Sequence, residues 1–429
     1  MEQLKGTLEW RDGGLRFSGV RGRNARTTVA ADGVCRFLPD GGWHVSFQRL
    51  ALDRFRAEHE AVLDALPAGL RRAVTSIHPR GMISVDGTLD VYTTSATATG
   101  RPGPAAASWD VAVDVEQARL DVGTALEHVH GGVRLRGHSD GRDWHCDGDL
   151  RIDSALWRGV QVTGVEGPLA IDARGVRFGT TASRPGEGEP RHVRARLGGG
   201  ELLLDGAAGG GAGEGFTLSA SLSDADLERM TDGSVPGLAA RKPFKGRVFA
   251  GLELAGSRAG AHALSGRGQV RLRDADLYEL PVVLAMLKVL RVKAPDLRAF
   301  GSSVIDFRID GPRACLDNIE LSGDAISLVG NGEIEADSSL HLTFRSIMGD
   351  SQAQLPAMKS VLGGASGNFL LIHVDGTVAD PQITSEAFPT LAAALQQWQE
   401  QTRRRDAATP PPAALLPASR SEEHTSELQ

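Results

Sequence analysis

Residues 305–310 read Ile-Asp-Phe-Arg-Ile-Asp, and residues 340–345 read Leu-His-Leu-Thr-Phe-Arg. In both stretches apolar side chains alternate strictly with polar or charged ones. Residues 369–374 add a continuous apolar run, Phe-Leu-Leu-Ile-His-Val, broken only by one histidine. Successive side chains of a β-strand point to opposite faces of the sheet. The pattern therefore predicts strands with one apolar face and one polar face.

The same two-residue rhythm extends far upstream of these stretches. It runs through residues 6–51 and returns at 109–116, 133–136, 150–152 and 169–171. Glycine is abundant, at 53 of 429 residues, and its spread between short apolar runs indicates many turns and bulges. A loose repeat of glycine, strand, turn and strand appears at Gly81–Val91, Gly266–Leu272 and Gly330–Ala336. We predict a mainly β fold: an elongated, curved antiparallel sheet, groove-like or taco-like in shape, with a few short helices packed on or in it.

Two segments have helical rather than strand spacing. Residues 53–77 carry apolar side chains at intervals of three and four, and Pro67 divides them into two predicted short helices. Residues 279–293 are apolar nearly all round, which predicts a helix that is buried or lies against lipid. Two interpretations remain open for it: a plug in the protein core, and a gate that contacts lipid.

Composition excludes several function classes. The net charge of −7 gives no basic surface for nucleic acid. The three cysteines, Cys35, Cys146 and Cys315, are far apart and form no CxxC pair, so neither a disulfide framework nor a thiolate metal site is predicted. No apolar run approaches the roughly 18 residues that a membrane-spanning helix needs.

No motif points to catalysis or to a metal or other cofactor. His128 and His130 could place two imidazoles on one strand face, but no third ligand is evident. His145 and Asp147 should share a face with Cys146 on the opposite one. The glycines of residues 206–215 lack the lysine of a phosphate-binding loop and predict a flexible linker. We therefore expect a protein that is not an enzyme and binds no cofactor.

Residues 321–332 and the ending Val-Asp-Gly-Thr-Val-Ala-Asp-Pro at 374–381 resemble the C-terminal region of the AsmA-like family. So does the segment 275–281, which leads into the apolar helix. The resemblance covers about residues 218–381. It implies a periplasmic β-groove related to TamB-like and other bridge-like lipid-transfer proteins, and it implies lipid as the ligand. The chain differs from the family in having no N-terminal membrane anchor.

The resemblance divides the chain into three predicted regions. Residues 1–205 form a β-rich middle region that carries the helical insert, and residues 216–400 form the AsmA-like C-terminal domain. Residues 401–429 are predicted to be a disordered tail, and residues 420–429 resemble a translated sequencing adapter. We expect the protein in the periplasm, anchored to the inner membrane through an N-terminal segment missing from this chain.

The predicted function is non-enzymatic binding and transfer of lipid between membranes, in support of outer-membrane homeostasis. The expected partners are phospholipid or another acyl lipid and components of the inner or outer membrane, with no nucleic acid. The alternatives are an assembly factor for outer-membrane proteins that uses exposed sheet edges, an ordinary closed sandwich or barrel, and a β-solenoid adhesin. The candidate lipid-binding residues are the apolar side chains of the helix and the C-terminal strands: Leu280, Val283, Leu284, Leu287, Leu290, Ile305, Phe307, Ile309, Leu340, Leu342, Phe344, Leu370, Ile372 and Val374.

Overall fold

One long antiparallel sheet makes up the fold. The computed structural model describes residues 2–24, 27–39, 41–56, 71, 75, 78–93, 105–121, 125–183, 189–209, 215–231, 245–257, 260–275, 301–323, 326–348, 370–377 and 380–387. Within these residues, 21 strands belong to a single sheet. The predicted mainly β, elongated antiparallel fold is confirmed.

The strands are β1 (Glu2–Arg11), β2 (Gly14–Asn24), β3 (Thr27–Phe37), β4 (Trp43–Arg56), β5 (Arg80–Thr93), β6 (Ala105–Asp121), β7 (Ala125–Ser139), β8 (Trp144–Trp157), β9 (Val160–Asp172), β10 (Gly175–Phe178), β11 (Val193–Leu197), β12 (Gly200–Gly209), β13 (Gly215–Asp226), β14 (Arg247–Ser257), β15 (Ser265–Arg273), β16 (Ser302–Asp310), β17 (Arg313–Ser322), β18 (Ile326–Ile334), β19 (Leu340–Met348), β20 (Leu370–Gly376) and β21 (Pro381–Ala387). The helical elements are α3 (Leu227–Thr231) and the 3₁₀ turns η1 (Gly179–Ala182) and η2 (Ala261–Ala263).

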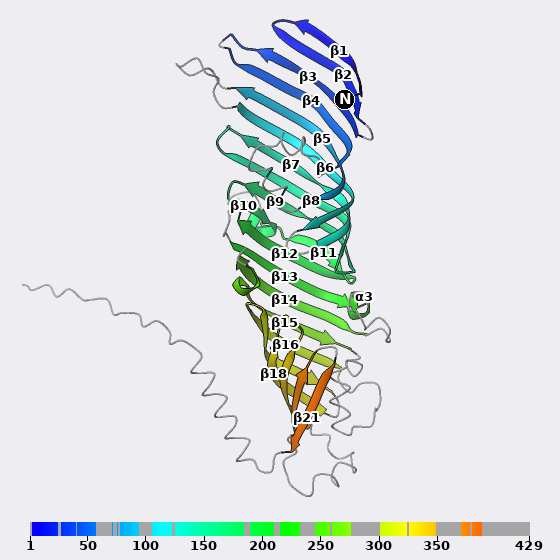
Figure 1. Cartoon of the computed structure of the whole chain (residues 1–429), viewed down its shortest axis with the longest axis vertical. Coiled ribbons are helices and arrows are strands. Elements are labelled where there is room, and N and C mark those ends of the chain that lie inside the picture. The colour runs from blue at the N-terminus through cyan, green and yellow to red at the C-terminus, as the bar shows by residue number, and fades with distance from the viewer. Residues whose placement is uncertain are drawn as a thin grey trace, which may run out of the picture.

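Each strand pairs with the next along the chain, so the sheet grows as a curved ladder from β1 to β21 (Figure 1). The one departure is at β10 and β11. Both short strands pair with β9 on one side and with β12 on the other, and together they fill one position in the ladder. The 21 strands therefore occupy 20 positions. At about 4.8 Å per position the ladder is roughly 90–95 Å long.

A series of β-bulges lies toward one end of the strands. Arg54 in β4, Gln117 in β6, His128 in β7 and Asp224 in β13 all have positive φ, between 49° and 56°. A register shift between paired strands occurs at or beside each of them. A bulge bends its strand and increases the local twist. Repeated bulges near the same end of many strands therefore account for the curvature of the sheet across its width.

The sheet does not fold back on itself. Among the described elements, the substantial contacts join strands that are neighbours in the ladder, and α3, η1 and η2 add contacts at its margins. A sandwich would need a second sheet facing the first, and a β-solenoid would pair its strands in parallel. All the strand pairings here are antiparallel. The sandwich and solenoid alternatives are therefore wrong for the described part of the chain.

Among the described residues, buried apolar side chains gather in three clusters. One lies in the C-terminal strands β17 to β20 and centres on Leu328 and Ile372. A second joins β9, β11, β13 and β14, and Leu227 and Met230 of α3 pack against it. The third is a small group in β6 to β8 around Ala118, Val129 and Ala155. The buried core is therefore divided among separate sites along the ladder instead of forming one centre.

Two local predictions need correction. Asp53 to Arg56, predicted to begin a helical insert, continue β4 instead, and Phe55 is buried. These residues form a strand despite their helical spacing because they pair with β5, where Ile83 is the register partner of Phe55. Gly206 to Gly209, predicted to be linker, belong to β12. Gly206, Ala207 and Ala208 pair with β13, so the sheet continues through the boundary proposed between residues 205 and 216.

Several other predictions lie outside the described residues. These are the remainder of the 53–77 insert apart from Arg71 and Thr75, the apolar helix at 279–293, and the tail at 401–429. Within the part of the chain that is described, no helix has the length and apolar character required to cross a bilayer.

Candidate functional site

A row of apolar side chains and glycines follows the ladder along one face of the sheet. The row can be traced by direct register partners through nine strands from β2 to β10 and eight from β12 to β19. Its members are Val20, Ala31, Leu50, Gly87, Val111, Leu135, Gly148, Leu169, Phe178, Gly206, Leu218, Leu254, Gly266, Ile309, Ala314, Ile334 and Leu340. None carries a polar side chain, and at about 4.8 Å per strand the row is roughly 75–80 Å long. We call this side of the sheet the apolar face.

The middle of the apolar face keeps part of its surface accessible. Leu50, Val111, Leu135, Leu218 and Leu254 are half-buried, whereas the alternate residues on the opposite side are mostly exposed and polar. Half-burial is expected where a side chain touches its neighbours on the sheet and no second layer covers it. The accessible part is therefore an apolar strip that runs across the strands. The side chains two positions away along each strand form the neighbouring rows on the same face.

The eight candidates whose side chains are described all lie on this face. Ile305 and Phe344 are linked through Ile319 and Gly330, and Phe344 pairs with Ile372. Phe307, Leu342 and Val374 fall in the adjacent row, and Ile309 and Leu340 in the next. Leu370 lies in β20. The predicted common face is therefore confirmed, whereas the helix residues Leu280, Val283, Leu284, Leu287 and Leu290 lie outside the described residues.

These eight residues differ in accessibility. Ile305, Phe307 and Ile309 of β16 are half-buried. The candidates of β19 and β20 belong to the C-terminal core: Leu340, Leu342, Phe344, Ile372 and Val374 have between 0% and 7% of their surface exposed. A lipid tail could reach the β16 side chains directly, but it would have to displace core packing to reach the other five. Lipid contact at all of these residues stays a prediction.

Sequence reasoning missed six cross-strand pairings in which an aromatic residue faces a glycine on the neighbouring strand. The pairs are Phe17 with Gly33, Trp109 with Gly137, Phe178 with Gly206, Phe216 with Gly256, Phe307 with Gly268, and Phe344 with Gly330. Each aromatic residue lies on the apolar face, and only strand register shows its glycine partner. The signal in the sequence was the excess of glycine, which we had attributed to turns.

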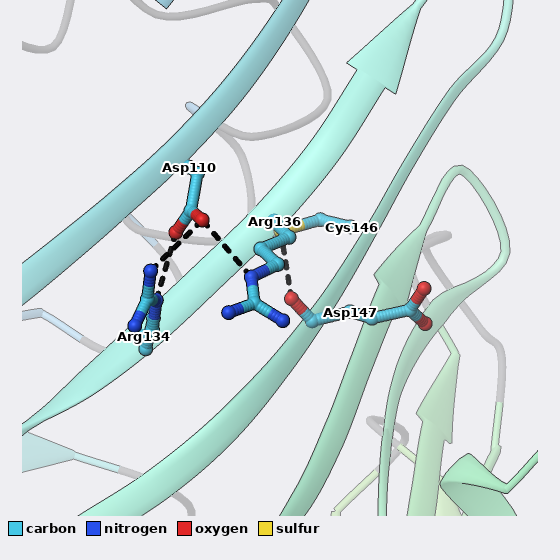
Figure 2. A network of polar contacts seen from close by, with 5 residues as sticks. All are labelled: Asp110, Arg134, Arg136, Cys146 and Asp147. Carbon is cyan, nitrogen blue, oxygen red and sulfur yellow. Dashed lines mark hydrogen bonds and ion pairs between the residues drawn. The ribbon is translucent and has the colours of Figure 1, made fainter. Parts of the chain in front are cut away.

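The opposite side, which we call the charged face, consists largely of cross-strand ion pairs. Figure 2 shows Asp110 of β6 between two arginines of β7. Its carboxylate accepts hydrogen bonds from Arg134 Nε at 2.8 Å and Nη2 at 2.9 Å, and from Arg136 Nε at 3.0 Å. Similar pairs join Arg308 to Asp317 and Arg267 to Glu253. Such pairs keep this face hydrated, and each adds little to stability because it is exposed.

The Asp110 contacts predict a small dependence of stability on pH. Hydrogen bonds from Arg134 and Arg136 lower the pKa of Asp110 below its ordinary value of 3.8, although partial burial opposes them. A carboxyl with a lowered pKa in the folded state stabilises the fold above its unfolded pKa and loses that contribution as pH falls. Asp110→Asn should therefore reduce stability at pH 7 by less than about 1 kcal/mol. In thermal unfolding monitored by circular dichroism, the difference between the two proteins should shrink as pH falls below the ordinary value of 3.8 and through the lowered pKa of the folded state. A difference that persists at low pH would contradict this origin.

Strand β8, which pairs with β7, contributes side chains to both faces. His145 Nε2 lies 2.8 Å from Asp147 Oδ1 on the charged face, as the alternation predicted. Cys146 between them is buried, and desolvation raises the pKa of its thiol to about 11 (Figure 2). A protonated, buried thiol is a poor nucleophile. Cys146 is therefore a packing residue.

A hollow of about 540 Å³ lies over β12 to β16. It is lined by Asp205, Glu253, Arg267 and Arg308 of the charged face and by Thr181 of η1. Arg267 pairs with Glu253 and Arg308 with Asp317, while Asp205 Oδ2 lies 2.6 Å from His192 Nδ1. Because these charges already have partners within the protein, the hollow offers no unpaired charge to a ligand.

The described residues include no group of three or more histidine, cysteine, aspartate or glutamate side chains placed to hold a metal ion. His128 itself occupies a bulge with φ of 49°, where the regular alternation that would align it with His130 is interrupted. What the described surface offers chemically is desolvation of apolar groups along one face. No family model, no curated protein and no solved structure matches the chain.

Proposed function

We propose that the protein is a non-enzymatic lipid-binding and lipid-transfer module of the bacterial periplasm. In this proposal acyl chains lie along the apolar face while head groups stay in water. The observation that carries the proposal is the row of apolar side chains and glycines that runs through 17 strands without a polar member. The resemblance to the AsmA-like family supports the same function.

The energetic reason is the cost of exposing hydrocarbon to water. Each methylene of an acyl chain costs about 0.8 kcal/mol in water. A chain of about 15 methylenes therefore meets a penalty of roughly 12 kcal/mol when it leaves a membrane unaided. Methylenes that lie against the half-buried side chains of the apolar face are shielded from water, which removes part of that penalty at each position. Because neighbouring positions are similar, a tail can move along the row without large barriers.

Lipid co-purification and uptake test the proposal. The purified chain should release phospholipid on organic extraction, detected by mass spectrometry, and should accept a fluorescent phospholipid from donor vesicles. Protein that carries no lipid and accepts none from vesicles would refute the proposal. Adding unlabelled vesicles in excess should reverse the uptake, which separates transfer from aggregation on the membrane.

A second candidate is an assembly factor for outer-membrane proteins, which would bind client strands at the edges of the sheet. In the described residues β1 pairs with β2 alone, and Leu8 and Trp10 on β1 are 66% and 67% exposed. A strand with a free edge and exposed apolar side chains is a template for another strand. Crosslinking from β1 that recovers β-barrel proteins, together with absence of lipid from the purified chain, would favour this candidate.

A further inference from the structure

The six aromatic–glycine pairs have glycine where the backbone does not require it. Positive φ is the usual reason for glycine in a strand, and none of Gly33, Gly137, Gly206, Gly256, Gly268 and Gly330 has φ in the left-handed region. The φ angles alone would allow an alanine at each position, although at all of them except Gly256 a Cβ atom would also lie within 3.0 Å of a backbone oxygen on a neighbouring strand. The requirement for glycine must therefore come from the space above the Cα atom.

That space is filled by the aromatic ring of the partner strand. A Cβ atom built on Gly256 would lie 2.7 Å from Cε1 of Phe216, and one on Gly206 would lie 2.5 Å from Cζ of Phe178. The corresponding distances are 2.6 Å for Gly33 and Phe17 and 2.5 Å for both Gly137 with Trp109 and Gly330 with Phe344. Gly268 and the ring of Phe307 are in equally close contact. Each ring thus leans across the neighbouring strand and covers its glycine.

A ring that lies across a glycine takes up less height than a ring that stands upright beside a side chain. Five of the six rings, those of Phe17, Trp109, Phe178, Phe216 and Phe307, are half-buried, so their outer sides remain part of the accessible apolar face. Phe344 is buried in the C-terminal core. The pairs occur from β2 to β19, along the same face as the apolar row.

From this geometry we propose that the aromatic–glycine pairs limit how far the rings project from the sheet. The apolar face then has no tall interruptions, and an unbranched acyl chain can lie across the rings. This inference rests on the proposed lipid function and names the residues that shape its binding surface. Aromatic rings laid over glycines also stabilise strand pairing, and that role alone would not affect lipid. The two roles can be separated by experiment.

The test uses two alanine substitutions in one strand. Gly256→Ala places a methyl group beneath the ring of Phe216 and should force the ring up from the sheet. Gly251→Ala is the matched control: Gly251 lies in the same strand on the charged face, and a Cβ there would meet nothing within 4 Å. Each protein is titrated with vesicles that contain a fluorescent phospholipid, and its unfolding midpoint is measured in parallel. We expect Gly256→Ala to weaken binding about fivefold, equivalent to about 1 kcal/mol, and Gly251→Ala to bind as the unmodified chain does.

A compensating substitution makes the test specific. Phe216→Leu in the Gly256→Ala background replaces the ring with a smaller side chain and should recover the binding lost through Gly256→Ala alone. A purely structural role predicts instead that these substitutions shift the unfolding midpoint and leave lipid binding unchanged. Binding unchanged by Gly256→Ala, or lost without recovery, would overturn the role of the pairs while leaving lipid binding by the unmodified chain intact. If neither the unmodified chain nor the Gly251→Ala control takes up lipid, the proposed function fails, and this inference fails with it.

Discussion

Ile372→Glu will prevent the C-terminal strands from folding. Ile372 has no exposed surface, pairs in register with Phe344, and belongs to the cluster that also contains Leu328 and Val374. A carboxylate at this position would be desolvated without a partner, and loss of the isoleucine would leave a cavity. Substitutions of this kind cost about 4–5 kcal/mol or more. We expect lost strand signal by circular dichroism and rapid proteolysis between β16 and β21.

Thr384→Glu provides the control for this substitution. Thr384 is exposed in β21 and is the register partner of His373. Both lie on the charged face, opposite the face that carries Ile372. A glutamate there stays in water and should leave the unfolding midpoint almost unchanged. If Ile372→Glu folds and unfolds as the Thr384→Glu protein does, the described C-terminal core is incorrect. Because the expected result for Ile372→Glu is unfolding, the β19 and β20 residues are poor positions for testing lipid contact.

Leu218→Glu is the better test, and we expect it to reduce lipid uptake at least about tenfold, equivalent to about 1.4 kcal/mol. Leu218 lies in the apolar row between its register partners Gly206 and Leu254 and is half-buried. The carboxylate of the introduced glutamate would stay hydrated in the lipid-free protein, and a bound acyl chain would desolvate it. The chain should therefore fold and lose lipid, as measured by uptake from fluorescent vesicles and by circular dichroism.

Thr217→Glu adds the same charge one residue away, on the charged face. Thr217 is exposed and pairs with Ala207 and Ala255, so no acidic residue is directly opposite it. We expect this protein to take up lipid as the unmodified chain does. Equal losses in the two variants would show that the effect of charge does not depend on the face, and would contradict binding along the apolar row.

Alternation in the sequence was sufficient to predict the strands and their two faces. It assigned Ile305, Phe307 and Ile309 to one side and Asp306, Arg308 and Asp310 to the other, and the structure agrees. The reason is that side-chain direction in a strand depends only on position along that strand. His145 and Asp147 were placed together for the same reason.

Properties that depend on partner strands could not be obtained in this way. Alternation does not reveal that Phe216 faces Gly256 or that Leu342 is buried while Phe307 remains half accessible. Both follow from register and from what packs above the face. Phe55 was misassigned because a bulge at Arg54 interrupts the strand period just before it. Residues 206–209 were predicted to be linker because their glycine and alanine composition does not show that they pair with β10 and β13.

Under the proposed function, one face of this long sheet would bind lipid while the other stays hydrated. The charged face carries neutralising pairs such as Asp110 with Arg134 and Arg308 with Asp317, which favour water over stacking against another sheet. The apolar face offers tails a surface of nearly uniform character. Bulges at Gln117, His128 and Asp224 bend the strands across their width. The proposal therefore requires no catalytic group.

Photocrosslinking of a bound lipid tests the central claim most directly. A phospholipid with a photoreactive group near the end of its acyl chain is loaded onto the unmodified protein, irradiated, and mapped by peptide mass spectrometry. The account predicts adducts on half-buried members of the apolar row, such as Leu135, Leu218 and Leu254, spread over many strands. Adducts confined to the charged face, or an absence of adducts from protein that demonstrably carries the probe, would contradict it.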